Sequence, residues 1–349
     1  MPLLEIEDLH VEFPSHGGVL HAVEGVSLTL DEGEVLGIVG ESGSGKSVTM
    51  LALMGLVAAP GRVRARKLAF AGRDLLHASD RERREIVGKD VAMIFQEPTT
   101  SLNPCFTIGF QLAETLKLHL GMDGKAARKR SVDLLEQVGI PAAATRLDEF
   151  PHQMSGGMNQ RVMIAMAIAC NPRLLIADEP TTALDVTIQA QILDLLRDLQ
   201  RERGMALVLV THNMGVVADM ARRVAVMYAG QVMEEREADD LFGMPQHPYT
   251  HALLAAMPER STGQSRLATI PGVRFEEYWI PAGAAVYAEG RAVERDPVAV
   301  PGVGYRVNDV LSFGAALRLG VGLFAVDANA KPLTTDISSF GIGIGASLG

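Results

Sequence analysis

The chain has 349 residues, more than one average domain, and 48% of them are apolar, which is enough for a full core. Its formal net charge of −10 argues against nucleic acid as the main partner, because domains that bind nucleic acid carry clustered positive charge. The two cysteines, Cys105 and Cys170, form no ligand cluster and favour a reducing compartment.

The first informative segment is the pattern G-x-x-x-x-G-K-S at residues 40–47. The apolar run Val35–Val39 before it is predicted to be a buried strand, and Val48–Leu56 after it is predicted to be a helix. Glycines let the backbone curl so that its N–H groups face phosphate oxygens, and a helix N-terminus adds partial positive charge. We expect Lys46 to reach the β and γ phosphates and Ser47 to offer its hydroxyl to Mg²⁺. The expected nucleotide-binding residues of this segment are Gly40, Glu41, Ser42, Gly43, Ser44, Gly45, Lys46, Ser47 and Val48.

The next apolar strand, Val91–Phe95, is followed by Gln96, whose amide is suited to contact Mg²⁺ or an attacking water. Residues 97–160 are predicted to form a helical subdomain. Apolar spacing predicts helix over Thr107–Leu120 and an amphipathic stretch over Val132–Val138. The basic run Lys125–Arg130 between them is interpreted as a solvated helix face rather than a lipid or nucleic-acid site.

A second glycine segment, Ser155-Gly156-Gly157, stands before the apolar stretch Val162–Cys170, which is predicted to be a helix. The free N–H groups at a helix N-terminus favour an anion. Such a segment cannot hold a nucleotide alone, but it can close over one held by another copy of the fold. The two glycine segments together predict half of an ATP-driven clamp.

Two further apolar strands end in polar residues. Leu174–Glu179 ends in adjacent carboxylates, of which Asp178 is suited to hold Mg²⁺ and Glu179 to take a proton from the attacking water. Leu207–Thr211 precedes His212, whose imidazole is suited to donate to the γ-phosphate. Taken singly, these residues are also compatible with a strand that happens to end in acid and with an ordinary histidine. Their order along the chain is the stronger observation.

In that order the chain resembles the ATP-binding-cassette ATPases. Met154–Met158 is similar to the family's signature, Thr182–Asp185 to its D-loop and Gln96 to its Q-loop. Met158 and Asn213 depart from the residues common there, but neither would remove a phosphate or metal ligand. Three segments are more narrowly similar to the importer ATPases for dipeptides, oligopeptides and nickel, namely Phe95–Pro104, Asp178–Thr187 and His247–Thr250. The resemblance runs from about residue 3 to about residue 273.

The resemblance implies an α/β fold of the P-loop NTPase type: an N-terminal antiparallel β subdomain, a RecA-like core and a helical subdomain, within residues 1–258. Residues 259–273 would be the family's C-terminal extension. ATP and Mg²⁺ are the implied cofactors, with Glu179, His212 and Gln96 catalytic and Ser47, Gln96 and Asp178 at the metal. Ser155, Gly156 and Gly157 would contact ATP on a partner subunit, with Asp185 packed across the same interface.

The assignment of Phe13 as the aromatic ring that stacks on adenine is the least specific one. Phe13 follows the strand-like Leu4–Ile6 and matches the position where the family stacks adenine, although a lone phenylalanine after a strand is more often part of the core.

The last quarter of the chain has a different pattern. From about residue 274, and clearly over 311–323 and 340–344, apolar and small residues alternate with the period of a β-strand, and Tyr305–Asp309 is predicted to be a turn. This β-rich tail, 274–349, resembles strands of an outer-membrane β-barrel and is interpreted as a fusion or artefact, or alternatively as a divergent regulatory domain. No cysteine follows Cys170, so the iron–sulfur cluster of related tails is not expected.

The implied partners are a second ATPase subunit, identical or related, two transmembrane permease subunits and, indirectly, a periplasmic substrate-binding protein. The acidic N-terminus shows no signal-peptide pattern, and no apolar run of the cassette approaches the ~20 residues that span a bilayer. A peripheral position on the cytoplasmic face of the inner membrane is therefore expected. The alternatives are an importer of nickel or another solute, a non-transport cassette, and a chimeric product without transport activity.

Overall fold

The computed structural model describes residues 2–15, 18–182, 185–255, 274–278, 287–291, 299–300 and 305–306. The chain divides into two compact units, Met1–Ala268 and Thr269–Gly349. Among the described residues, no helix is both long and apolar enough to cross a bilayer.

An antiparallel sheet forms one side of the larger unit. Its strands follow the order β2-β1-β5-β6, with β4 also paired to β1. They are β1 (Leu4–Ser15), β2 (Gly18–Leu30), β4 (Arg62–Arg64), β5 (Lys67–Phe70) and β6 (Arg73–Asp74). Phe13 lies within β1, opposite Leu20 of β2, and not after the strand as the sequence suggested. β1 pairs with β2 along its whole length, so it continues well beyond its apolar start. The short hydrophobic run at Leu4–Ile6 could not indicate this length.

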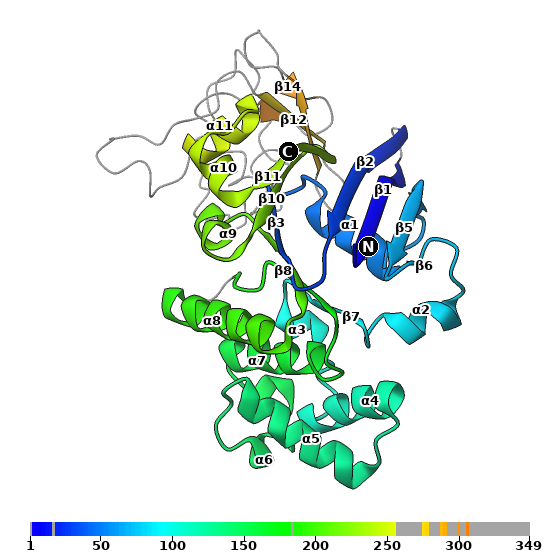
Figure 1. The fold of residues 1–349 in the computed structure, drawn as a ribbon, viewed down its shortest axis with the longest axis vertical. Helices are drawn as coiled ribbons and strands as arrows, with labels where there is room; N and C mark the ends of the chain where they lie inside the picture. The colour runs from blue at the N-terminus through cyan, green and yellow to red at the C-terminus, as the bar shows by residue number, and fades with distance from the viewer. Residues whose placement is uncertain are drawn as a thin grey trace. The chain divides into compact units, whose positions relative to one another are not determined.

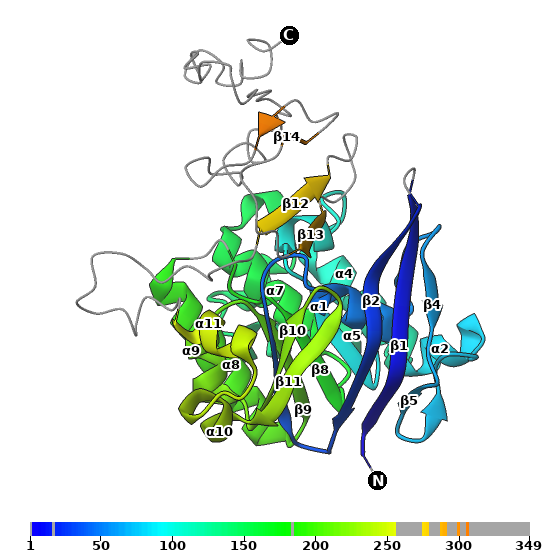
Figure 2. The same cartoon turned by 90° about the horizontal axis from the view of Figure 1, so that it is seen from above.

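The central sheet lies beside it and has the order β11-β10-β3-β9-β8-β7 (Figure 2). All neighbours from β10 to β7 pair in parallel, and β11 is antiparallel to β10. The strands are β3 (Val35–Val39), β7 (Val91–Ile94), β8 (Leu174–Asp178), β9 (Ala206–Thr211), β10 (Arg223–Tyr228) and β11 (Gln231–Glu237). The parallel strands are almost wholly apolar because cores cover both of their faces. Their carboxyl ends therefore meet along one edge, where ligands bind in open α/β sheets.

Helices cover the central sheet and build a separate lobe. Figure 1 shows α4, α5 and α6 forming this helical lobe at the lower end of the view. The helices are α1 (Lys46–Met54), α2 (Asp80–Ile86), α3 (Pro98–Ser101), α4 (Ile108–Leu120), α5 (Gly124–Gln137), α6 (Ala143–Arg146), the 3₁₀ turn η1 (Pro151–Gln153), α7 (Gly156–Ala167), α8 (Val186–Arg203), α9 (Met214–Met220), α10 (Ala238–Gly243) and α11 (Pro248–Ala255).

The bounds of three helices differ from those that apolar spacing predicted. The helix expected over Val48–Leu56 spans Lys46–Met54, because Gly55 turns the chain in the left-handed region with φ 69°. The stretch expected over Val132–Val138 belongs to α5, which begins at Gly124 because Asp123 caps it and which includes the basic run. The helix expected over Val162–Cys170 is α7, which begins at Gly156 behind the cap of Ser155 and ends at Ala167.

The C-terminal unit has two short antiparallel pairs among its described residues. β12 (Arg274–Tyr278) pairs with β13 (Tyr287–Arg291), and β14 (Ala299–Val300) pairs with β15 (Tyr305–Arg306). Tyr305 and Arg306 thus belong to a strand rather than to the expected turn, whose last three residues lie outside the described residues. The alternating stretches 311–323 and 340–344 also lie outside them.

Candidate functional site

The loop between β3 and α1 is held in a shape that requires glycine. Gly40, Gly43 and Gly45 have φ values of 151°, 82° and 96°. A Cβ on Gly40 would lie 2.1 Å from the carbonyl oxygen of Met227, and one on Gly45 would lie 2.6 Å from that of Ala22. Larger residues therefore cannot replace these two glycines without moving the backbone.

Lys46, the first residue of α1, is buried within the loop. Its ammonium donates hydrogen bonds to the carbonyl oxygens of Gly40 at 2.8 Å and Glu41 at 2.7 Å. Burial lowers the pKa of this ammonium, and the nearby carboxylates of Glu179 and Asp178 oppose that shift. The loop thus holds a cation and the free N–H groups of a helix start together, which suits a phosphate chain.

Ser47 of α1 and Asp178 of β8 are hydrogen-bonded to each other. The Ser47 hydroxyl donates to Asp178 Oδ1 at 2.9 Å, and the Asp178 side chain is buried. Burial raises the pKa of Asp178 to about 6, although the Ser47 hydrogen bond and the charge of Lys46 act in the opposite direction. Hydroxyl and carboxylate oxygens are the donors that Mg²⁺ prefers, so this pair fits the metal. Gln96 is exposed, and its amide donates a hydrogen bond to Glu179, the residue after Asp178.

The Glu179 carboxylate contacts side chains that follow β7, β8 and β9. Its Oε2 accepts hydrogen bonds from Gln96 Nε2 at 3.1 Å and from the Thr182 hydroxyl at 2.8 Å. Its Oε1 lies 3.2 Å from His212 Nδ1, a hydrogen bond when that nitrogen carries the proton. Side chains following β7, β8 and β9 are therefore joined through one carboxylate, as expected for parallel strands that end at the same edge.

The backbone of Glu179 is unusual for a residue with a side chain. Its φ is 44°, in the left-handed region that glycine favours. The turn after it brings Thr182 back, with the Thr182 N–H bonded to the Glu179 carbonyl at 3.1 Å. Thr182 was not predicted as a site residue. The signal that could have found Thr182 is its position three residues after Glu179, across a turn that follows a buried strand.

The second glycine segment lies apart from the phosphate loop. Ser155 caps α7, its hydroxyl accepting the Met158 N–H at 3.3 Å, and both Ser155 and Gly156 are exposed. A Cβ on Gly156 would meet nothing within 4 Å, and one on Gly157 would lie 3.3 Å from Ile188. Within the described residues, no hydrogen bond joins this segment to residues 40–47. The exposed helix start is thus free to meet another molecule.

The remaining predicted site residues lie at three other places. Asp185 caps α8 by accepting the Ile188 N–H at 2.9 Å and is exposed beside residues 183–184, which lie outside the described residues. Phe13 is half-buried in β1, where its ring faces Gly61. Val48 is half-buried and packs on the core between the two sheets.

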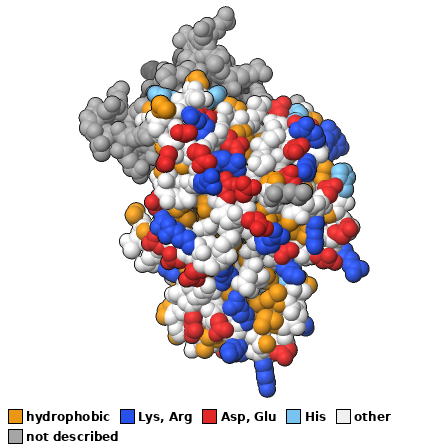
Figure 3. Space-filling view, viewed as in Figure 1, with side chains coloured by type: hydrophobic (Ala, Val, Ile, Leu, Met, Phe, Trp, Pro, Cys, Tyr) orange, Lys and Arg blue, Asp and Glu red, His pale blue; other side chains and the backbone are white. Residues whose placement is uncertain are grey.

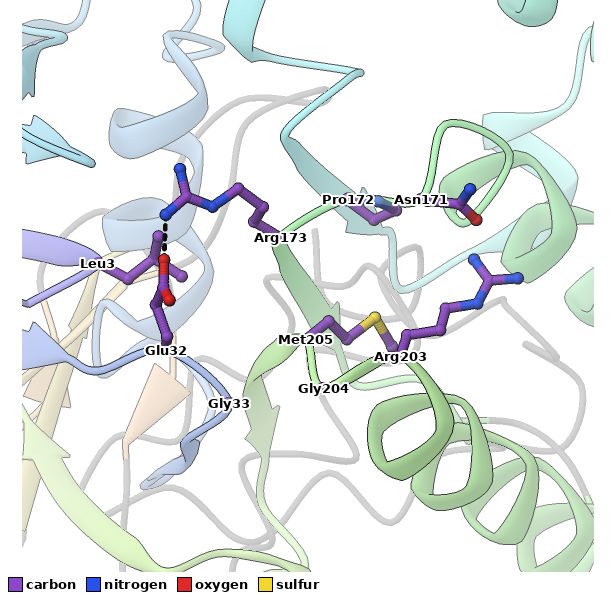
Figure 4. A pocket seen from close by; sticks show the side chains of 9 residues that line it. All are labelled: Leu3, Glu32, Gly33, Asn171, Pro172, Arg173, Arg203, Gly204 and Met205. Carbon is purple, nitrogen blue, oxygen red and sulfur yellow. Dashed lines mark hydrogen bonds and ion pairs between the residues drawn. The ribbon is translucent and has the colours of Figure 1, made fainter.

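A hollow of about 180 Å³ lies at the opposite edge of the central sheet (Figure 4). Its charged groups have partners: Arg173 pairs with Glu32, and the Arg203 guanidinium donates to the carbonyl of Ile168 and to Gln137. It lies at the amino ends of β8 and β9, away from the converging strand ends. The lining residues are Leu3, Glu32, Gly33, Asn171, Pro172, Arg173, Arg203, Gly204 and Met205. This hollow is therefore not the candidate site.

Three family models match the chain. The model described as "ABC transporter" matches residues 23–182, and the one described as "Oligopeptide/dipeptide transporter, C-terminal region" matches residues 233–287. A third, described as "AAA domain, putative AbiEii toxin, Type IV TA system", matches residues 150–218. The second match extends past residue 273, where the sequence resemblance was expected to end. The first spans the phosphate loop, the second glycine segment and the Asp178–Glu179 pair.

Individual proteins agree with the two transporter models. The dipeptide transport ATP-binding protein DppD of Escherichia coli (strain K12) is 55% identical over 302 residues, which cover 85% of this chain and 92% of the relative. The oligopeptide transport ATP-binding protein OppD of Bacillus subtilis (strain 168) is 53% identical over 272 residues, 77% of this chain and 76% of the relative. A solved dimeric ATP-binding cassette in a post-hydrolysis state, bound to ADP and Pi, matches with a TM-score of 0.60 and 29% identity, over 67% of this chain and 98% of that one.

Proposed function

The chain belongs to the ATP-binding-cassette transporter ATPases, and from that premise we propose that it hydrolyses ATP to power import of dipeptides or oligopeptides through separate membrane subunits. The observation that carries the proposal is the convergence of Gln96, Thr182 and His212 on Glu179, next to the Ser47–Asp178 pair. The likeness to DppD and OppD and the matched C-terminal region favour peptides as the cargo.

In the proposed reaction, residues 40–48 bind the phosphates of ATP. The loop N–H groups and the Lys46 ammonium contact phosphate oxygens, for which Lys46 exchanges part of its bonding to Gly40 and Glu41. Phe13 offers the half-buried ring on which adenine would stack. Ser47, Asp178 and Gln96 would hold Mg²⁺, which when bound neutralises charge on the β and γ phosphates.

Glu179 is proposed as the general base. Its carboxylate takes a proton from water while the water oxygen attacks the γ-phosphorus, the bond to the bridging oxygen breaks and ADP leaves. Gln96 and Thr182 orient the carboxylate through its Oε2, and His212 lies on its Oε1 side, from which the imidazole can donate to the γ-phosphate.

The site is proposed to be completed by a second ATPase subunit, identical or related. The exposed start of α7, with Ser155, Gly156 and Gly157, would approach ATP held on the partner's loop, and Asp185 would pack across the same interface. Because ATP contacts both subunits only in the closed pair, its binding favours closure and its hydrolysis favours opening.

The helical lobe is the proposed docking surface for the two transmembrane permease subunits. Figure 3 shows hydrophobic side chains gathered on this lobe. At its surface, Phe106 and Phe110 are stacked with ring centroids 4.6 Å apart and are exposed, and Leu118 of α4 is exposed too. Exposed apolar groups of this kind mark interaction sites. Docking there would place the chain peripherally on the cytoplasmic face of the inner membrane, with a periplasmic substrate-binding protein acting from the other side.

The proposal is tested by purifying the chain with its native partners from the host and reconstituting the complex in vesicles. We expect two membrane subunits and an ATPase partner to co-purify, and ATP hydrolysis to rise when a peptide-loaded binding protein is added. If a nickel-loaded binding protein raises ATP hydrolysis and a peptide-loaded one does not, the cargo is nickel and not peptides. A chain that co-purifies with no membrane subunit would contradict the transport function.

A further inference from the structure

The turn after β8 sets the direction of the Glu179 carboxylate. Glu179 has a φ of 44°, and a residue with a side chain keeps such a conformation only where neighbouring contacts hold it. Its N–H donates to the Val210 carbonyl at 2.8 Å, which fixes the end of the strand. The residues after Glu179 therefore decide where its carboxylate lies.

A buried glutamine of α7 holds the first residue of this turn. Gln160 is 2% exposed, and its Nε2 donates to the carbonyl oxygen of Pro180 at 2.7 Å. Pro180 is buried as well, and a proline has no N–H, so its backbone can be fixed by a hydrogen bond only through this oxygen. A buried carbonyl left without a partner is costly, and Gln160 is the partner that the described residues supply.

A second glutamine holds the next residue of the turn from α8. Gln189 Nε2 donates to the Thr181 carbonyl at 3.1 Å. Both of these residues are half-buried, so water can replace this hydrogen bond if it is lost. Gln160 and Pro180 are buried, and water cannot replace theirs as readily. The Gln160 hydrogen bond is therefore the one on which the conformation of the turn depends most.

We propose that Gln160 is a positioning residue for Glu179 and acts through the Pro180 carbonyl. Its hydrogen bond keeps the turn in the conformation that holds the carboxylate beside Thr182 and His212. Without it, the Pro180 carbonyl turns toward another partner and moves the carboxylate with it. A general base must lie within hydrogen-bond reach of the proton that it takes, so hydrolysis slows.

ATP binding should not change with it, because the phosphates are held by residues 40–48 and not by this turn. The inference rests on the proposed role of Glu179 as the base. Its signature is a lower kcat with an unchanged affinity for ATP. Misplacing a catalytic group by about 1 Å costs on the order of 100-fold in rate, so a loss of about 10-fold to 100-fold is expected.

The test uses the complex purified with its native partners and compares Gln160→Met with wild type. Methionine is similar to glutamine in length and volume but cannot donate to the carbonyl. Gln200→Met is the matched control, because Gln200 Nε2 donates to the carbonyls of Gly33 and Met205 at the opposite edge of the sheet. Gln160→Asn, whose amide is one carbon shorter, gives the same test with a polar side chain in place.

Three quantities are measured: kcat for ATP hydrolysis, the dissociation constant of a non-hydrolysable ATP analogue, and the melting temperature. Both Gln160 variants should lose about 10-fold to 100-fold in kcat and bind the analogue as wild type does. Gln200→Met should keep the wild-type kcat even where its melting temperature falls as far. A wild-type kcat in the Gln160 variants would overturn the inference, as would weaker analogue binding in them or an equal loss of kcat in Gln200→Met.

The double variant of Gln160→Met with Glu179→Gln separates positioning from a general loss of structure. If Gln160 acts through the carboxylate, its replacement should cost no further activity once Glu179→Gln has removed the base. A further loss as large as the one that Gln160→Met causes alone would overturn the inference. Hydrolysis by Glu179→Gln at the wild-type rate, or failure of wild type to bind the analogue, would instead refute the proposed function.

Discussion

The burial of Asp178 gives a stability prediction with a defined sign. Its pKa is about 6 in the folded protein against an ordinary value of 3.8, so between these values the folded state binds more protons than the unfolded state. Stability contributed by this group is therefore full below pH 4 and is lost as the pH rises through 6. The difference between these two pKa values corresponds to roughly 3 kcal/mol.

Asp178→Asn removes the charge and keeps an oxygen that can accept from Ser47. In metal-free buffer, we expect the free energy of unfolding of the variant, minus that of wild type, to rise by about 3 kcal/mol between pH 4 and pH 7 and then to level off. Urea unfolding followed by far-ultraviolet circular dichroism measures both values at each pH. Ser47→Ala should shift the midpoint of the dependence on Asp178 above pH 6, because the Ser47 hydrogen bond lowers that pKa.

A difference between Asp178→Asn and wild type that stays constant from pH 4 to pH 8 would refute the reasoning. So would a difference that falls as the pH rises. Either result would mean that the carboxylate is better solvated, or better paired with Lys46, than its buried position beside Ser47 implies.

Three further predictions concern the loop, the ring and the tail. Gly40→Ala should abolish ATP binding and destabilise the fold by about 1–3 kcal/mol or more, because its Cβ would lie 2.1 Å from a carbonyl oxygen. Gly124→Ala, with open space around it, should be tolerated. Equal free energies of unfolding for the two variants would contradict this prediction. Phe13→Ala should raise the KM for ATP while the exposed Val19→Ala on the neighbouring strand does not, and an unchanged KM would remove the adenine assignment. Deletion of 274–349 should leave ATP hydrolysis intact, and a truncated protein that stays folded but inactive would show that the tail serves the ATPase.

The edge of the sheet that carries the candidate site was predictable from sequence because its residues follow buried strands at fixed positions. Gln96, Glu179 and His212 each come after an apolar run, and parallel pairing brings such ends together. The loop at 40–47 was predictable for the same reason, since strand, glycines, lysine and helix must occur in that order.

Contacts between distant segments were not predictable in the same way. Tyr249 reaches Tyr228 only because β11 pairs with β10 and Glu234 fixes the start of α11, and no pattern in the sequence specifies either contact. The start of α5 was missed because its first turns are charged and carry no apolar period, so only the cap at Asp123 indicates it.

The most direct test of the central claim is Glu179→Gln in the complex purified with its native partners. The change removes the proposed base and leaves the groups around the phosphates in place. We predict that the variant binds ATP as tightly as wild type and hydrolyses it at least ~100-fold more slowly, the usual contribution of a general base. Hydrolysis at the wild-type rate with the same ATP occupancy would contradict the assignment of Glu179 and the proposed reaction with it.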